Sequence, residues 1–204
     1  MGMTTKKMET TQLSRKEQIV LASAKLFREK GFEAASMRDI ARALGIEAAS
    51  LYSHIKSKDE LLEIICFQMA DRLLKAIDEV NDIYFNAEEK LRMAISNHVK
   101  IVTDDLDASS VFLREWRHLK PEKLKEFIPL RNKYEDGFTH ILINGENENV
   151  FEAADKKFAV LTILSAVNWI TEWYQPNGSK SPGEIADHLC DFILTGLKVK
   201  SLQS

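Results

Sequence analysis

Small and polar side chains gather on one face of a short helical segment, residues 47–55. Its apolar face carries Leu51 and Ile55 at helical spacing. The side chains that point the other way are Glu47, Ala49, Ser50, Ser53 and His54. Hydroxyl and imidazole groups form hydrogen bonds, and short side chains let a helix backbone approach a partner closely. This face therefore has the chemistry to contact a polar surface at close range.

The preceding segment indicates what that surface is. A predicted helix over residues 37–44 is joined to the helix over residues 47–55 at Gly45. A turn of this length that contains glycine makes two short helices cross steeply, as in a helix-turn-helix unit. The second helix then fits the major groove of DNA, which is about 12 Å wide. Any small helical bundle has short amphipathic helices, so the spacing alone leaves a purely structural alternative open.

Helical periodicity covers almost the whole chain and predicts an all-α fold of about nine helices. Four helix starts have the spacing of a capping box, with its serine at Ser14, Ser36, Ser57 or Ser181. A long helix is expected from Pro121, with a kink at Pro129. Residues 153–174 are apolar nearly all round, which predicts one helix that is buried on more than one side.

Charge and composition narrow the class of protein. Residues 1–58 carry eleven Lys and Arg against six Asp and Glu, whereas residues 59–204 carry seventeen against twenty-five. A basic end on an acidic body favours a polyanion partner at that end. No membrane span, metal-ligand spacing, P-loop or nucleotide fingerprint is present, so we expect no membrane, metal, cofactor or enzyme activity. Cys66 and Cys190 are expected as buried free thiols, which places the protein in the cytoplasm.

Three stretches together carry a resemblance to a known family. Residues 24–32 read AKLFREKGF, residues 36–46 read SMRDIARALGI, and residues 50–62 read SLYSHIKSKDELL. In these residues and their spacing the chain resembles the TetR family of bacterial repressors. The resemblance implies an N-terminal three-helix DNA-binding domain and a C-terminal helical bundle that binds a ligand and dimerises.

The resemblance also implies which residues meet double-stranded DNA. They are Ser36, Arg38, Glu47, Ala48, Ala49, Ser50, Tyr52, Ser53, His54 and Lys58. Tyr52 and His54 match the Tyr-x-His phosphate clamp of the family, and Lys58 matches a phosphate-binding lysine at the start of the fourth helix. Hydroxyls, lysines and helix N-terminal amides all suit phosphate oxygens. The bases are left to residues 47–50 and Ser53.

Two departures from the family pattern affect this interpretation. Ile55 stands where the family usually has phenylalanine, which keeps an apolar side chain there. Ala48 and Ala49 offer methyl groups, which suit thymine methyl contacts more than hydrogen bonds to bases. Structural roles also stay open: Ser36 is a helix cap in any case, and Tyr52 has the pattern of a half-buried residue.

The C-terminal region concentrates the aromatic residues, including all three tryptophans. Short stretches around residues 114–119, 131–134, 168–178, 184–187 and 195–197 are similar to a subgroup of TetR repressors that govern fatty-acid and steroid catabolism and respond to acyl-CoA thioesters. The effector is therefore expected to be small and hydrophobic, an acyl-CoA by this resemblance. The residues expected to bind it are Phe112, Trp116, Arg117, Arg131, Tyr134, Phe138, Trp169 and Trp173.

Ordinary roles compete with this ligand hypothesis. Aromatic residues at helical spacing are more often plain core. Arg114, Arg117 and Arg131 suit an anionic head group at the mouth of a tunnel, and each equally suits a salt bridge to a neighbouring glutamate. A multidrug-type repressor and a ligand-independent dimeric DNA-binding protein remain alternatives, and a solidly packed domain would favour the latter.

The expected organisation has three parts: a disordered arm over residues 1–12, the helix-turn-helix domain over residues 13–58, and the ligand-binding and dimerisation domain over residues 59–204. The last two helices are apolar on more than one face and are expected to form a homodimer. A two-fold dimer places the two reading helices in successive major grooves, which predicts a palindromic operator.

Overall fold

The structure is a computed structural model that describes residues 13–153 and 155–197. The arm predicted at residues 1–12 lies outside the described residues. Within them every regular element is helical, so the predicted all-α fold is confirmed. No helix in the described part is both long and apolar enough to cross a membrane.

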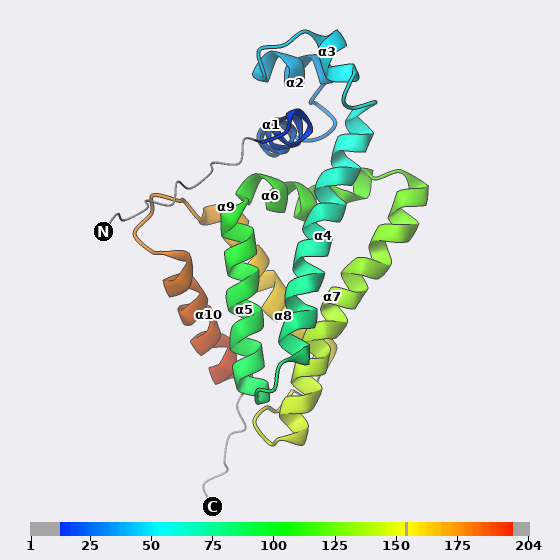
Figure 1. Cartoon of the computed structure of the whole chain (residues 1–204). Coiled ribbons are helices and arrows are strands. Elements are labelled where there is room, and N and C mark those ends of the chain that lie inside the picture. The colour runs from blue at the N-terminus through cyan, green and yellow to red at the C-terminus, as the bar shows by residue number, and fades with distance from the viewer. Residues whose placement is uncertain (1–12, 154, 198–204) are drawn as a thin grey trace, which may run out of the picture.

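Helices α1 to α3 form a head at one end of the molecule, and the remaining helices form the body (Figure 1). The elements are α1 (Arg15–Lys30), α2 (Met37–Ala43), α3 (Ala48–Tyr52), α4 (Lys58–Asp82), α5 (Ala87–Asp104), α6 (Leu106–Arg114), the 3₁₀ turn η1 (Trp116–His118), α7 (Pro121–Asn147), α8 (Lys156–Asn168), α9 (Ile170–Trp173) and α10 (Pro182–Leu197). Helix α4 starts in the head and runs the length of the body, packed against α5, α6 and α7. Helix α10 packs along α5 on the outside.

The predicted helix starts are confirmed by their hydrogen bonds. Ser14 and Ser36 form reciprocal capping boxes with the residues three positions on, and Ser181 does the same with Glu184. Ser57 accepts from the Glu60 amide. The Glu60 carboxylate, however, accepts from the amide of Lys56 and not from that of Ser57, at 2.7 Å. Each start therefore has its first amides satisfied locally, which is why these positions are readable from sequence.

Two predicted helices are interrupted. The single helix expected over residues 153–174 is divided at Trp169 into α8 and α9, and the Thr171 hydroxyl donates to the Asn168 carbonyl across this break. The helical spacing of Val111, Phe112, Trp116 and Leu119 also predicts one helix, but α6 ends at Arg114 and the chain continues as η1. Counting α8 and α9 as one, residues 13–153 and 155–197 contain nine α-helices, the number expected from the sequence.

The apolar core has two parts, and α4 contributes to both. The upper part joins α1 to α3 with the first half of α4, with Val111 and Phe112 of α6 and with Phe127 of α7. The lower part joins the second half of α4 to α5, α7, α8 and α10. The head core thus runs across the predicted domain boundary after residue 58. An ion pair of 2.9 Å between Arg28 and Asp107 also ties α1 to α6. The head and the body therefore share packing through α4 and α6.

Candidate nucleic-acid interface and effector cavity

Helix α3 is held by its apolar side. Leu51 and Ile55 are almost fully buried in the upper core. Gly45 has φ +64°, a left-handed conformation that glycine adopts without strain, and it separates α2 from α3. The helix is shorter than the predicted 47–55, because α-helical geometry ends at Tyr52 and the chain continues as a turn in which His54 and Ile55 donate to the Leu51 carbonyl.

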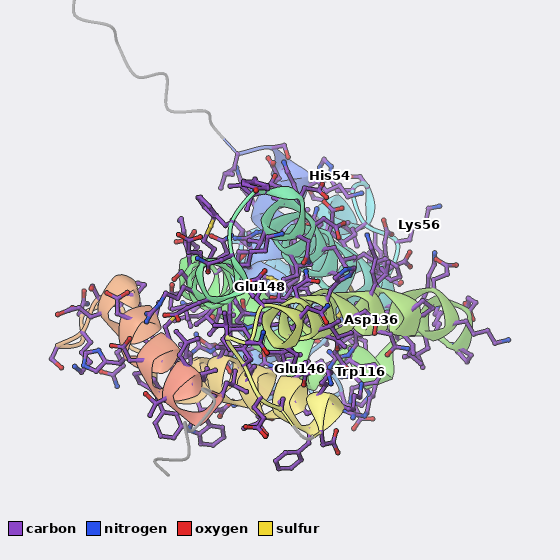
Figure 2. All side chains as sticks on the ribbon, turned by 90° about the horizontal axis from the view of Figure 1, so that it is seen from below. His54, Lys56, Trp116, Asp136, Glu146 and Glu148 are labelled. Carbon is purple, nitrogen blue, oxygen red and sulfur yellow. The ribbon has the colours of Figure 1, made fainter. Side chains whose placement is uncertain are left out.

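The opposite side of α3 faces outward. Eight of the ten predicted DNA-contacting residues are exposed: Ser36, Arg38, Glu47, Ala49, Ser50, Tyr52, Ser53 and His54. Ala48 and Lys58 are half-buried. Tyr52 is 54% exposed, more than the half-buried residue its spacing indicated. Figure 2 looks along the molecule from the end opposite the head and shows His54 and Lys56 on its outside.

Ser36 already has a structural task at the start of α2. Its hydroxyl donates to the Asp39 carboxylate at 2.5 Å and accepts from the Asp39 amide at 3.2 Å. The bond from the hydroxyl lowers the pKa of the Asp39 carboxyl, with smaller contributions from Lys30, from the Ser36 amide, which donates to the same carboxylate at 3.2 Å, and from Arg42. Arg38, on the same helix, is exposed and forms no ion pair or hydrogen bond with any residue the structure describes. Arg38 is thus the cation of α2 that is ready for a phosphate.

Lys58 holds the loop between α1 and α2. Its ammonium group donates to the carbonyls of Phe32, Glu33 and Ala35 at 2.7, 3.1 and 2.9 Å. It also lies 4.4 Å from the centre of the Phe32 ring. The sequence assigned this residue a phosphate contact only, and no spacing rule pointed to a link from α4 back to a loop more than twenty residues earlier.

This link predicts a stability effect. Replacing Lys58 by methionine keeps an unbranched side chain and removes three hydrogen bonds from a charged donor. The free energy of unfolding of the head should fall by about 2 kcal/mol, because hydrogen bonds to charged groups contribute about 1.5–3 kcal/mol. Chemical denaturation followed by circular dichroism measures this, with Lys56→Met as the control because Lys56 is exposed. Equal stability of the two variants would show that Lys58 serves DNA contact alone.

Two arginines stack on one tryptophan at the side of the body. The guanidinium of Arg117 lies 4.3 Å from the Trp116 ring centre and that of Arg131 lies 4.9 Å from it. Arg131 also lies 5.6 Å from the Phe112 ring. Burial lowers the pKa of Arg131, an effect that Glu135 opposes and Arg117 reinforces. Figure 2 shows Trp116 beside α7. Stacking places two like charges close together, an arrangement that suits an anion.

The third candidate arginine has a different role. Arg114 forms an ion pair with Glu172 of α9, with a hydrogen bond of 3.1 Å from its Nε. Arg114 was considered for two roles, ligand binding and a salt bridge, and the structure shows the salt bridge. Arg117 and Arg131, by contrast, form no ion pair with any carboxylate in residues 13–153 or 155–197.

An internal cavity lies between α4, α5, α6, α7 and α8. It is lined by Ala70, Leu73, His98, Phe112, Leu113, Leu130, Arg131, Tyr134, Glu135, Leu164 and Asn168. Three predicted ligand residues, Phe112, Arg131 and Tyr134, line it directly. Phe138 is buried behind Tyr134, with ring centres 5.5 Å apart. The free space is about 30 Å³, comparable to the volume of one water molecule.

Trp169 and Trp173 are not part of this cavity. They are 63% and 47% exposed on the chain, and Phe158 and Leu161 on α8 and Phe192 on α10 are exposed as well. Aromatic rings project from the α8 and α10 side of the body in Figure 2. Within one subunit, residues 153–174 are therefore not buried on more than one side as predicted. Their outer side is an exposed apolar surface.

The cavity also contains three polar residues that the sequence did not single out as ligand residues, His98, Glu135 and Asn168. His98 lies on α5 among the apolar positions that include Ile95 and Val99, and it is 2% exposed. The sequence signal that could have identified His98 was a histidine among apolar residues at helical spacing. In the described ranges, no group of three or more His, Cys, Asp or Glu side chains is placed to hold a metal ion, and Cys66 and Cys190 are buried free thiols.

Known proteins match both parts of this architecture. Residues 19–65 match the family described as bacterial regulatory proteins, tetR family, and residues 85–197 match the tetracyclin repressor-like C-terminal domain. The chain is 24% identical over 186 residues to the HTH-type transcriptional repressor KstR2 of Mycolicibacterium smegmatis, covering 90% of this chain and 91% of that one.

Two solved structures are similar to the whole fold. PfmR, a TetR family transcriptional regulator from Thermus thermophilus, is 33% identical with a TM-score of 0.80, over 89% of this chain and 99% of that one. AibR in complex with isovaleryl coenzyme A and operator DNA is 26% identical with a TM-score of 0.78, over 88% and 97%. The exposed reading helix, the two-part core and these matches show that the chain belongs to the TetR family of bacterial regulators.

Proposed function

We propose that this protein is a transcriptional repressor that binds a palindromic operator as a homodimer and is released by a small hydrophobic effector of the acyl-CoA class. The observation that carries the proposal is the outward face of α3: its apolar side is fixed in the head core while the predicted DNA contacts are exposed together. We further propose that it acts in the cytoplasm and catalyses no reaction.

The DNA contacts divide by chemistry. We assign Arg38, Tyr52 and His54 to phosphates, because they carry cationic or hydrogen-bonding groups on or near α3. The Ser36 amide donates to the Asp39 carboxylate at 3.2 Å, so Ser36 reaches a phosphate only if it gives up that bond. Residues 47–50 and Ser53 lie on or next to α3 itself and are assigned to the bases. Lys58 can contact a phosphate only if its ammonium group gives up hydrogen bonds to backbone carbonyls. We therefore assign its contribution to DNA binding mainly to stabilising the loop between α1 and α2.

The homodimer is assigned to the apolar face of α8 and α10. A large exposed apolar patch marks an interaction site, and this patch combines Phe158, Leu161, Trp169 and Phe192. Pairing of the same face on two subunits gives a two-fold axis, and that axis orients the two heads toward successive grooves.

The effector is assigned to the cavity and the stacked arginines beside it. Arg131 belongs to both features, since it lines the cavity and stacks on Trp116. An acyl chain suits the apolar wall formed by Leu73, Phe112 and Leu164, and the phosphates of coenzyme A suit Arg117 and Arg131. AibR, a protein of similar fold, has been solved with isovaleryl coenzyme A.

Release follows from the position of α4. Because the free space is about 30 Å³, a ligand larger than water must separate the helices that line it. Ala70 and Leu73 of α4 are among its walls, and the same helix begins in the head at Lys58. The effector binds the expanded state more tightly, so it shifts the population away from the head spacing that fits DNA.

The narrow cavity also favours a second candidate, a ligand-independent DNA-binding dimer. One experiment decides between them. An operator is selected from random double-stranded DNA with the purified protein, and its binding is then titrated with acyl-CoAs of increasing chain length and with hydrophobic drugs. Release by acyl-CoA supports the proposed function, release by drugs alone supports a multidrug-type repressor, and no release by any compound supports the ligand-independent dimer. Selection of no sequence overturns all three.

The stacked arginines give a separate prediction. Replacing Arg117 by glutamine should weaken binding of an acyl-CoA about five- to tenfold, because one charge-assisted bond to phosphate is lost at an exposed site. Binding of the matching acyl-pantetheine, which has no phosphate, should not change. Arg114→Gln is the matched control, since it removes the same charge from a residue that is already paired. Equal losses in both variants would assign the effect to general electrostatics.

A further inference from the structure

One ring nitrogen in the effector cavity has no hydrogen-bond partner. His98 Nδ1 lies 2.8 Å from the Tyr134 hydroxyl, whereas His98 Nε2 is buried and makes no hydrogen bond of normal geometry in the described part of the chain, although the Asn168 side chain lies close to the ring. Leaving a buried polar group unsatisfied costs about 1–3 kcal/mol. Such groups are rare in folded proteins, and a site that retains one in a cavity wall is suited to receive a polar atom of a ligand.

The hydrogen on that nitrogen follows from its neighbours. Burial lowers the pKa of His98 to about 4, and a weaker hydrogen-bonding interaction of the ring with the Asn168 side chain opposes this shift, so the ring is neutral near pH 7. Burial also raises the pKa of Tyr134, which keeps its hydroxyl hydrogen. If that hydroxyl donates to Nδ1, only Nε2 is unsatisfied; with the opposite assignment the hydroxyl hydrogen is unsatisfied as well. We therefore assign the tautomer in which Nε2 carries hydrogen and is a donor.

The surroundings define the chemistry of the missing acceptor. Leu73, Phe112 and Leu164 make the neighbouring wall apolar, and Arg131 leads from the cavity to the stacked indole of Trp116. The free space of about 30 Å³ accommodates an oxygen atom. The matching ligand has an apolar chain, then an oxygen that accepts a hydrogen bond, then an anionic group. In a thioester of coenzyme A the carbonyl oxygen stands between the chain and the phosphates.

We propose that His98 Nε2 donates a hydrogen bond to the thioester carbonyl oxygen of the effector, and that Tyr134 is a positioning residue that fixes the imidazole from the other side. This inference rests on the proposed function, since it needs an effector in this cavity. The effector is then recognised at three points: its acyl chain, its thioester carbonyl and its phosphates.

The test compares two ligands that differ in one oxygen atom, dodecanoyl-CoA and its thioether S-dodecyl-CoA. Dissociation constants are measured by titration calorimetry on the full-length protein. The wild-type protein should bind the thioester about tenfold more tightly, which corresponds to one hydrogen bond. Hydrophobicity alone acts in the other direction, because the thioether is the less polar ligand. The preference should vanish in His98→Phe, persist in part in His98→Gln, which keeps a donor, and shrink in Tyr134→Phe.

The outcomes separate this inference from the proposed function. Wild-type protein that binds both ligands equally, or a His98→Phe variant that keeps the tenfold preference, overturns the inference and leaves an acyl-CoA repressor. Protein that binds neither ligand overturns both the acyl-CoA assignment and the inference. Circular dichroism melting checks the fold of each variant, and should His98→Phe be unfolded, the wild-type ligand pair and His98→Gln still decide.

Discussion

Replacing Phe192 by glutamate should leave the subunit folded and weaken operator binding more than about hundredfold. Phe192 is 79% exposed on α10, so the substitution disturbs no packing within the chain. In the proposed dimer the same side chain is covered by the partner, and each subunit would bury an unpaired carboxylate against apolar residues such as Leu161. The cost of burying two such charges is several kcal/mol. A single subunit reaches one half-site only and loses the gain from joining two.

Light scattering coupled to gel filtration gives the mass of the particle, and a gel-shift titration gives its operator affinity. Tyr84→Glu is the matched control, since Tyr84 is a fully exposed aromatic residue in the α4–α5 connection and belongs to neither α8 nor α10. It should stay dimeric and bind normally. If the Phe192→Glu protein remains a dimer with unchanged operator affinity, the dimer forms through another face of the subunit.

The helix starts were predictable because each depends on a few neighbouring residues. A serine that accepts from the amide three positions on, as at Ser14, Ser36 and Ser181, satisfies an amide that lacks a helical partner. The interruption at Trp169 was missed because the apolar spacing continues across it, with Val167 and Ile170 both buried. Local rules therefore locate helix starts better than breaks.

The outward orientation of this face of α3 was predictable for a related reason. Leu51 and Ile55 fix the orientation of a short helix, and the polar residues between them then point outward. The effector residues were harder, because helical spacing gives the same pattern for a core residue, a cavity wall and a dimer face. Trp169 and Trp173 have the spacing of buried residues, yet both are exposed within one subunit. In the proposed function the partner subunit covers this face. His98 is the reverse case, a polar residue whose neighbours across α7 and α8 are invisible in a linear sequence.

Replacing Ser50 by glutamate should reduce operator affinity about hundredfold without changing stability. Ser50 is exposed on α3, and its hydroxyl makes no hydrogen bond within the described residues, while its backbone carbonyl accepts from the Ser53 hydroxyl. A carboxylate placed there enters the groove between phosphate strands. A penalty of about 1.4 kcal/mol in each half-site gives about a factor of ten per subunit and a hundred per dimer.

The control must separate the location of the charge from its amount. Lys125→Gln changes the net charge of the chain by the same one unit on an exposed part of α7, so it tests long-range repulsion alone. It should lower affinity less than about twofold at physiological salt, because charges beyond about 8 Å are screened. If the two variants lose affinity equally, α3 does not enter the groove, and the outward face of this helix would no longer support a DNA-reading role. Arg38→Ala would then distinguish a displaced head from one that touches phosphates only, by its effect on the salt dependence of binding.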